Sequence, residues 1–181
     1  MDMAILHWIQ ENIVADWLTP LMRCITFFGE YGAGWILLAL GLLIPKKTRW
    51  MGLSVGAALL LGLLLGEFGI KNLICRPRPF VAEEMALLIP APHGFSCPSG
   101  HTTSSFAAAT SLFLYHKKWG AVALVMAGLV AFSRMYFFVH YLTDVLFGVV
   151  LGIACALAAR WIIQKIRTAT VRKEQMQWKS A

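Results

Sequence analysis

Long apolar runs separated by short polar connections dominate the chain. Four of these runs are close to the ~20 residues that cross the hydrocarbon core of a bilayer. They are residues 51–70, 98–115, 119–138 and 142–163. A fifth run, 25–44, also crosses if Glu30 lies near the interface. The pattern predicts an all-α, polytopic membrane helix bundle with five transmembrane helices.

The first 24 residues follow a different pattern. Their polar positions recur at four- or eight-residue steps: His7, Glu11, Thr19 and Arg23. This spacing is typical of a helix that lies along the membrane interface, here with a break near Pro20. Each charge at a bilayer centre costs about 2.5–3.5 kcal/mol, so the segment is a poor span. We predict an amphipathic helix over 1–24, or a sixth crossing if Glu11 and Asp16 face protein.

Glycines spaced four residues apart occur in two of the apolar runs. Gly62 and Gly66 form one pair, and Gly148 and Gly152 form the other. Small residues at this spacing let membrane helices approach closely, although glycine is common in such helices anyway. We expect contact seams at both pairs, with an ordinary membrane-helix composition as the alternative.

Composition and charge support a membrane protein of one domain. Of the 181 residues, 59% are hydrophobic and 14% are charged, unlike an ordinary soluble domain. Five crossings use most of this length, so we expect a single membrane-embedded domain over 1–181. The net charge of +7 could suggest nucleic acid. Its basic residues instead gather at the ends of apolar runs, which favours membrane lipids as neighbours and no nucleic-acid partner.

The distribution of basic residues predicts an orientation. In chain order they follow the first span (25–44), the third (98–115) and the last (142–163), at 46–49, at 117–118 and in the tail 165–181. By the positive-inside bias these positions are cytoplasmic, as is the C-terminus. The opposite helix ends, at 71–97 and 134–144, then face outward. The first residues lack a basic n-region and a small-residue cleavage site, so we expect no removable signal peptide.

A basic cluster lies at the outward end of the second span. The stretch KNLICRPRP, from Lys71 to Pro79, places Lys71, Arg76 and Arg78 within eight positions. Snorkelling cations at a helix end are one explanation. A site for an anion is the other.

The sequence CPSGH, from Cys97 to His101, begins the next apolar run. Proline and serine suit a helix start, and the free amides around Gly100 point toward any anion that binds there. An ordinary capped N-terminus does not explain His101 at the same end, because histidine is suited to moving protons near neutral pH.

A third cluster spans the outward junction of the last two spans, from Ser133 to Asp144. His140 and Asp144 are four residues apart, so on a helix they share a face and the carboxylate can orient the imidazole as a nucleophile. A local hydrogen bond is the alternative. An acid near the start of an apolar helix is costly unless it is paired and useful.

The predicted topology brings all three clusters to one face of the membrane, as a single site requires. They read Lys-x6-Arg-Pro, Pro-Ser-Gly-His and Ser-Arg-x5-His-x3-Asp. In these motifs the chain resembles the type 2 phosphatidic acid phosphatase (PAP2) superfamily, which is similar to vanadium haloperoxidases. No signature position departs from the family pattern.

The resemblance implies a phosphate pocket that needs no metal or other cofactor. Lys71, Arg78 and Arg134 would hold phosphate oxygens, with Ser99 and the Gly100 amide beside them. Preplaced cations of this kind stabilise the charge of a transition state.

The resemblance also implies how the phosphoryl group moves. His140 would attack phosphorus to form a phosphohistidine, oriented by Asp144. His101 would protonate the departing oxygen and then activate water.

Neighbouring residues carry further hypotheses. Glu67 precedes Lys71 by four residues and can tether it by an ion pair. Arg76 lies between the phosphate-binding cations but outside the motif. Contact with the substrate is one hypothesis for it, and a role without substrate contact is the other. Cys75 and Cys97 flank the outward loop, where a disulfide is permitted if the loop is extracytoplasmic.

The resemblance implies hydrolysis of a lipid phosphate or diphosphate, with undecaprenyl diphosphate as the first choice and phosphatidic acid or phosphatidylglycerophosphate as the second. A different class of function is a membrane transporter or scaffold that kept this fold and lost the chemistry. The presence of both histidines, Asp144 and three cations argues against that class. The motifs do not indicate an oligomeric state.

Overall fold

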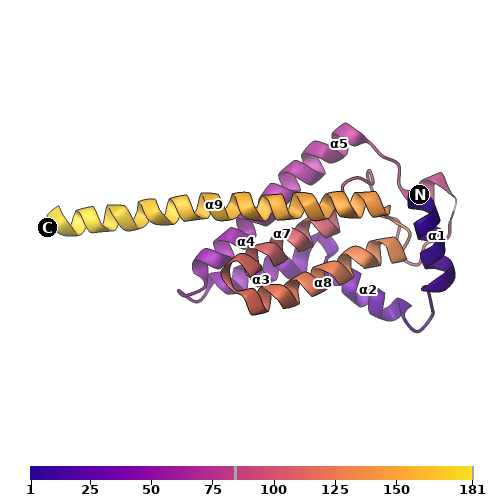
Figure 1. Cartoon of the computed structure of the whole chain (residues 1–181), viewed down its shortest axis with the longest axis horizontal. Coiled ribbons are helices and arrows are strands. Elements are labelled where there is room, and N and C mark those ends of the chain that lie inside the picture. Colours follow the sequence, from indigo (N-terminus) through magenta and orange to yellow (C-terminus); the bar gives the residue numbers. More distant parts are fainter. Residues whose placement is uncertain (84, 181) are drawn as a thin grey trace.

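The computed structural model describes residues 1–83 and 85–180, and this part of the chain is helical with no strands (Figure 1). The elements in chain order are α1 (Asp2–Asn12), α2 (Thr19–Phe28), η1 (Glu30–Gly32), α3 (Ala33–Leu43), α4 (Arg49–Gly62), η2 (Leu63–Ile70), α5 (Lys71–Ile74), α6 (Pro79–Ala82), α7 (Gly100–Tyr115), α8 (Lys117–Tyr136) and α9 (Leu142–Ser180).

Helix α7 is the centre of the bundle and packs against α4, α8 and α9. Its small residues Ala107, Ala108 and Ala109 are completely buried, which allows close approach of the surrounding helices. The end of α9 extends well beyond the other helices (Figure 1).

Both predicted glycine seams are confirmed. The pair Gly62 and Gly66 faces α7 and α9, and the pair Gly148 and Gly152 faces α7. A Cβ added at Gly62 would lie 3.2 Å from the Thr103 side chain of α7, and one at Gly66 would lie 3.3 Å from Leu151 of α9 and 3.9 Å from Thr103. On α9, a Cβ at Gly152 would lie 2.6 Å from the Thr103 carbonyl oxygen. Helices α4 and α9 therefore approach α7 as closely as their glycines permit.

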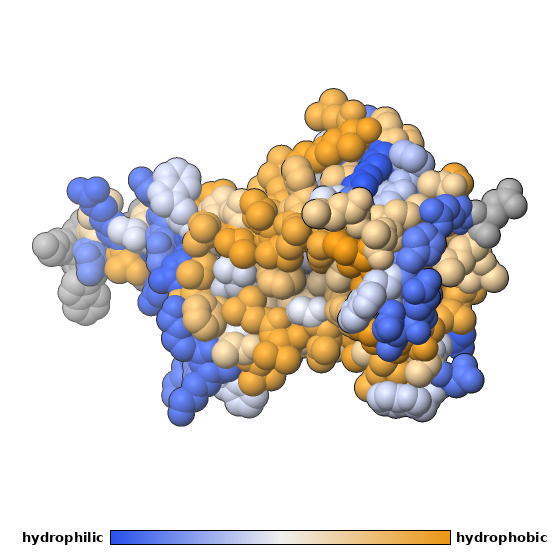
Figure 2. All heavy atoms as spheres, turned by 45° about the vertical axis from the view of Figure 1, so that its right-hand side comes forward, coloured by the Kyte–Doolittle hydropathy of each residue, from blue (hydrophilic) through white to orange (hydrophobic). Residues whose placement is uncertain are grey.

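The outer surface of the bundle is apolar. Figure 2 shows a hydrophobic belt between two more hydrophilic ends. Within the described residues, three helical segments are long and apolar enough to cross a membrane: Arg49–Ala82, Lys117–Tyr136 and Leu142–Arg172. A fourth crossing results if α2 and the Glu30–Leu43 segment form one bent span. The fold is therefore the predicted all-α membrane helix bundle, whereas the count of five crossings is not established.

The apolar run 25–44 does not form one continuous helix, contrary to the prediction. It bends by 41° between α2 and the following helical segment. Tyr31 and Gly32 have φ values of 50° and 69°, in the left-handed region that interrupts a right-handed helix. Glu30 lies at this bend.

The predicted helix over 1–24 is also divided. Helix α1 ends at Asn12, and α2 begins at Thr19 with Pro20 in its first turn. Proline therefore starts a helix here instead of breaking one, because a first-turn residue needs no backbone donor. Helix α1 lies across one end of the bundle (Figure 1), where Leu6 and Ile9 are buried.

The run 51–70 is helical as predicted, but its second half is a π-helix, η2. Together α4, η2 and α5 are helical from Arg49 to Ile74. Cys75, with φ of 51°, ends this helix and turns the chain toward the first motif's arginines. π-helical turns are rare and occur frequently at functional sites, and this one contains Glu67 and immediately precedes Lys71.

Candidate active site

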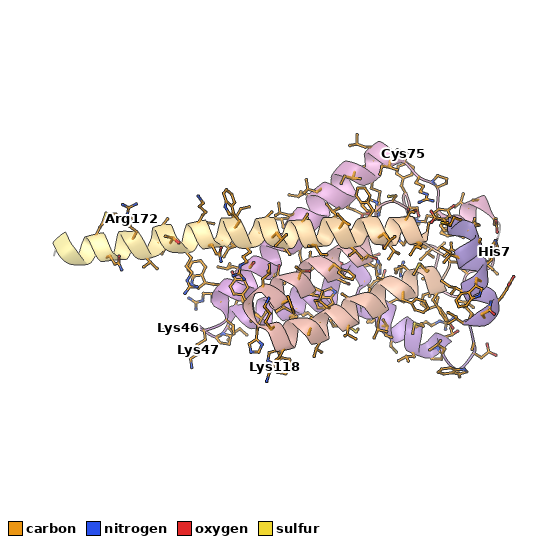
Figure 3. The ribbon with its side chains drawn as sticks, viewed as in Figure 1. His7, Lys46, Lys47, Cys75, Lys118 and Arg172 are labelled. Carbon is orange, nitrogen blue, oxygen red and sulfur yellow. The ribbon has the colours of Figure 1, made fainter. Side chains whose placement is uncertain are left out.

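The three motifs meet at one end of the bundle, as the sequence predicts. Lys71 begins α5, Ser99 caps α7, and His140 lies in the connection between α8 and α9. Figure 3 shows Cys75 and His7 at this end and places the basic residues Lys46, Lys47, Lys118 and Arg172 toward the other. The site end and the basic end are therefore opposite.

His140 is buried between a cation and a carboxylate. Its Nε2 lies 3.1 Å from Nη1 of Arg78, and its Nδ1 lies 3.7 Å from Oδ2 of Asp144. Phe138, with φ of 58°, reverses the chain between α8 and α9 and so positions this imidazole. Burial lowers the pKa of His140 to about 3, so the imidazole is neutral at neutral pH and Nε2 keeps its lone pair.

The contact between His140 and Asp144 differs from the predicted hydrogen bond across one helix face. His140 precedes the first residue of α9, so only Asp144 is helical. Ser96 lies close to both, with Oγ 3.5 Å from the imidazole Nδ1 and 2.5 Å from Oδ2 of Asp144. The carboxylate of Asp144 therefore acts on the imidazole by its charge, without a direct hydrogen bond, and the Ser96 hydroxyl lies close to both groups.

Asp144 is completely buried and its two oxygens have separate partners. Oδ1 accepts a hydrogen bond from Nη1 of Arg76 at 2.6 Å. Oδ2 accepts from the Ser96 hydroxyl and, at 3.0 Å, from the backbone amide of Tyr141. A buried carboxylate needs such donors, and these fix its plane.

Arg78 joins two loops through backbone carbonyl groups. Its Nε donates to the Gly94 oxygen at 2.9 Å, and its Nη2 donates to the His93 oxygen at 3.0 Å. Its Nη1 donates to the oxygen of Val139 at 3.1 Å and faces His140. The guanidinium is thereby fixed next to the imidazole.

Lys71 is tethered by Glu67, as predicted. The ammonium group lies 2.7 Å from each oxygen of the Glu67 carboxylate. A Cβ added at Gly100 would lie 3.1 Å from Oε2 of Glu67. The carboxylate therefore lies beside both the lysine and the N-terminus of α7, two groups that bind anions.

Arg134 and His101 both present buried nitrogen atoms to the site. Nη1 of Arg134 donates to Oγ1 of Thr26 at 2.5 Å, and its Nε has no partner in the described part of the chain. Nε2 of His101 is also buried without a hydrogen bond, 3.7 Å from Oε2 of Glu30. Buried donors without partners are costly. An anionic ligand in the site would give both nitrogen atoms a hydrogen-bond acceptor.

Ser99 serves the fold directly. Its hydroxyl oxygen accepts hydrogen bonds from the Thr102 hydroxyl at 2.9 Å and from the Thr102 amide at 3.4 Å. Its own amide donates to the carbonyl oxygen of Asp144 at 3.2 Å. The predicted helix cap is confirmed, and it links the start of α7 to the start of α9.

The disulfide considered for the outward loop is not formed. Cys75 is exposed and Cys97 is buried, and both are free thiols, as are Cys24 and Cys155.

Sequence reasoning missed three residues around the site. Ser96 contacts His140 and Asp144, Glu30 approaches His101, and Asp2 contacts Arg76. Ser96 and Glu30 lie next to predicted features but have no motif spacing, and Asp2 is 74 positions from Arg76. Arg76 itself touches a catalytic-motif carboxylate, a contact that the sequence did not suggest.

Comparisons with known proteins indicate the family of the chain. The family model of the PAP2 superfamily matches residues 49–168. The undecaprenyl-diphosphatase of Sulfolobus acidocaldarius is 35% identical over 139 residues, 75% of this chain and 67% of that protein. The decaprenylphosphoryl-5-phosphoribose phosphatase of Mycobacterium tuberculosis is 34% identical over 155 residues, 83% of this chain and 84% of that protein.

A solved structure is similar throughout. The crystal structure of a transmembrane PAP2 type phosphatidylglycerolphosphate phosphatase from Bacillus subtilis superposes with a TM-score of 0.74 at 30% identity, covering 91% of this chain and 85% of that one. The chain belongs to the PAP2 superfamily. It is a membrane lipid phosphatase of that superfamily.

Proposed function

We propose that the protein hydrolyses a polyprenyl diphosphate, with undecaprenyl diphosphate as the first choice, to the monophosphate and inorganic phosphate. The observation that carries the proposal is the position of His140, whose Nε2 lies 3.1 Å from Nη1 of Arg78 while its other nitrogen faces Asp144. The undecaprenyl-diphosphatase of Sulfolobus acidocaldarius, at 35% identity, supports the choice of lipid.

The cations and a helix start hold the terminal phosphoryl group. Lys71, Arg78 and Arg134 bind its non-bridging oxygens, and the Gly100 amide at the start of α7 adds a neutral donor, with Ser99 beside it. Their positive charge opposes the negative charge of the transition state. No metal is required for this stabilisation.

The nucleophile of the first step is Nε2 of His140. It forms a bond to phosphorus as the bond between phosphorus and the bridging oxygen breaks, which leaves a phosphohistidine. Asp144 stabilises the positive charge that develops on the imidazole. His101 donates a proton to the departing oxygen.

The second step reverses the first. His101, now neutral, accepts a proton from water, and the water oxygen attacks phosphorus. The bond between phosphorus and Nε2 breaks, and His140 returns to its neutral state. Inorganic phosphate leaves, and no oxidant or reductant takes part.

The proposed arrangement in the membrane has five crossings. Four of them are the three long apolar helical segments and the bent pair of α2 with Glu30–Leu43. The fifth is α7, which lies at the centre of the bundle between α4, α8 and α9, although it has only 16 residues. α1 lies at the interface. The whole chain, 1–181, is one domain, with the site outside the cytoplasm and the basic tail 165–181 inside; Ala181 of that tail lies outside the described residues.

Phosphatidylglycerophosphate or phosphatidic acid is the second candidate substrate. It is favoured by the similarity to the phosphatidylglycerolphosphate phosphatase from Bacillus subtilis. A transporter or scaffold function has no comparable support, because the relatives reported above are named as phosphatases and diphosphatases.

The test is phosphate release by detergent-solubilised protein. His140→Ala and His101→Ala should each reduce turnover by at least about 100-fold, and acid-labile phosphate should label the unchanged protein but not His140→Ala. Unchanged turnover in both variants would overturn the mechanism. Isoprenoid and glycerol lipids, each as monophosphate and diphosphate and with chelator present, identify the substrate and test metal independence together.

A further inference from the structure

The N-terminal helix α1 reaches the buried carboxylate of the site through one arginine. Nη2 of Arg76 lies 2.8 Å from Oδ2 of Asp2, and Nη1 lies 2.6 Å from Oδ1 of Asp144. The guanidinium therefore bridges an acid of α1 and the acid that faces His140. Bridges of this kind between charged groups are the strong hydrogen bonds of proteins.

The position of Arg76 is determined by further contacts. The hydroxyl of Thr143 accepts from Nη1 of Arg76 at 2.6 Å and donates to Oδ2 of Asp2 at 2.5 Å. The guanidinium also lies over the ring of Tyr141, 3.8 Å from its centroid. Side-chain exposure is 29% for Arg76 and 20% for Asp2, so the network is partly shielded from screening by solvent ions.

Helix α1 is itself firmly attached to the bundle. Leu6 and Ile9 are buried in a cluster with residues of α8 and α9 and the turn between them. Nε2 of Gln10 donates to the carbonyl oxygen of Tyr136 at 2.9 Å, and His7 lies 2.8 Å from the Glu83 carboxylate. Asp2 is therefore presented to Arg76 from a fixed helix.

The charges explain why a second acid is useful. With Arg76 alone, the charge of Asp144 would be fully neutralised, and its stabilisation of a cationic imidazole would be lost. Asp2 shares the guanidinium, so two carboxylates and one cation leave one net negative charge on the Asp144 side of His140, opposite Arg78. The pKa of Asp2 is lowered because hydrogen bonds from Arg76 and Thr143 outweigh its burial, so this acid stays ionised.

We propose that Asp2 and Arg76 are positioning residues for phosphoryl transfer: α1 holds Arg76 on Asp144 and so sets the orientation and net charge of the carboxylate that acts on His140. This inference rests on the proposed function, in which His140 is the nucleophile. It assigns α1 a part in the reaction, in addition to its contact with the membrane interface.

The first test is kinetic and uses full-length protein with a C-terminal tag, so that the N-terminus is unaltered. Asp2→Asn should lower kcat by roughly 10- to 100-fold, because the nucleophile is less well placed, with KM changed by less than about twofold. Asp2→Glu should restore most of kcat. Glu11→Gln, an exposed acid on the same helix, is the matched control and should behave as the unchanged enzyme.

The second test is the pH dependence of kcat/KM, measured down to about pH 3 with one substrate for all variants, because the acid limb reports protonation of His140 in the free enzyme and burial lowers the pKa of this group to about 3. Asp2→Asn removes a negative charge, so the acid limb should move to lower pH. Arg76→Ala removes a positive charge, so the limb should move to higher pH, and Arg76→Lys should largely prevent that shift. A role in folding alone would not produce opposite shifts in the two variants.

Coupling between the two residues provides the decisive comparison. In an Arg76→Ala background, adding Asp2→Asn should change kcat by less than about twofold, because Asp2 acts through Arg76. An unchanged kcat in Asp2→Asn, or limbs that move in the same direction, would overturn the inference. His140→Ala separates the two proposals: if it retains activity, the proposed function fails, whereas a silent Asp2→Asn with an inactive His140→Ala defeats this inference alone.

Discussion

Glu67 is the residue whose neighbours suggest competition with substrate. Its carboxylate pairs with Lys71 and lies beside Gly100 at the start of α7. Glu67→Gln should therefore free the lysine charge and strengthen inhibition by vanadate, a phosphate mimic, by about two- to fivefold, the range of a partly exposed ion pair. Inhibition of lipid phosphate hydrolysis measures this effect.

A matched control exists for that substitution. Glu83 is exposed to a similar degree and pairs with His7 instead of a site cation. Glu83→Gln should leave vanadate inhibition unchanged. Weaker inhibition in Glu67→Gln would show that Glu67 positions Lys71 for phosphate and does not compete with it.

His140 should remain neutral across the physiological pH range. Because burial lowers its pKa to about 3, the folded protein does not bind the proton that the unfolded chain binds below about pH 6.5. Stability therefore decreases as the pH falls below that value. Ring-nitrogen NMR of ¹⁵N-histidine-labelled protein, with His140→Asn to assign the signal, should show no titration of His140 between pH 5 and 8; a midpoint within that range would contradict the prediction.

The close packing of α9 against α7 gives a prediction for a whole element. A Cβ at Gly152 would lie 2.6 Å from the Thr103 oxygen and 2.9 Å from the Ala107 nitrogen, and both are backbone atoms that cannot move independently. Gly152→Ala should destabilise the fold by about 1–3 kcal/mol. Gly128→Ala is the control, because a Cβ there meets nothing within 4 Å. Thermal unfolding in detergent compares them, and equal midpoints would exclude a tight seam.

Local sequence determined the elements that could be predicted. Pro98, Ser99 and Gly100 carry the chemistry of a helix start, and the structure begins α7 at Gly100. The interruption at Tyr31 was not predictable in the same way, because a non-glycine residue with positive φ has no local signal. The π-helical turns around Glu67 also depend on packing, because Gly66 and Gly69 weaken an α-helix but do not specify a π-helical turn.

The site was predictable as a cluster but not in its connections. Motif spacing and topology indicated that Arg78, His140 and Asp144 would meet, and they do. The Ser96 hydroxyl between the imidazole and the carboxylate follows from the path of a loop, which no periodicity describes. The contact from Arg76 to Asp144 joins residues 68 positions apart, so it depends on the complete fold.

At the scale of the whole molecule, the orientation in the membrane can be tested with a native thiol. Cys75 is an exposed free thiol at the site end. In intact cells, a Cys24→Ser variant should react at Cys75 with a membrane-impermeant maleimide added outside. Lys46→Cys, combined with Cys24→Ser and Cys75→Ser, should react only after the membrane is opened. The reverse pattern would place the site in the cytoplasm.

The shortness of α7 has a consequence for the lipid around the protein. Its 16 residues rise by about 24 Å, less than the ~30 Å of a typical hydrocarbon core. In the arrangement proposed above, the far end of α7 lies beside Lys117 and Lys118 at one surface, and the helix start proposed to bind phosphate lies several ångströms beneath the other. We therefore expect the phosphate of the proposed lipid substrate to sink below the plane of the neighbouring head groups before it reacts, so that the acyl-chain length of the surrounding leaflet affects the rate.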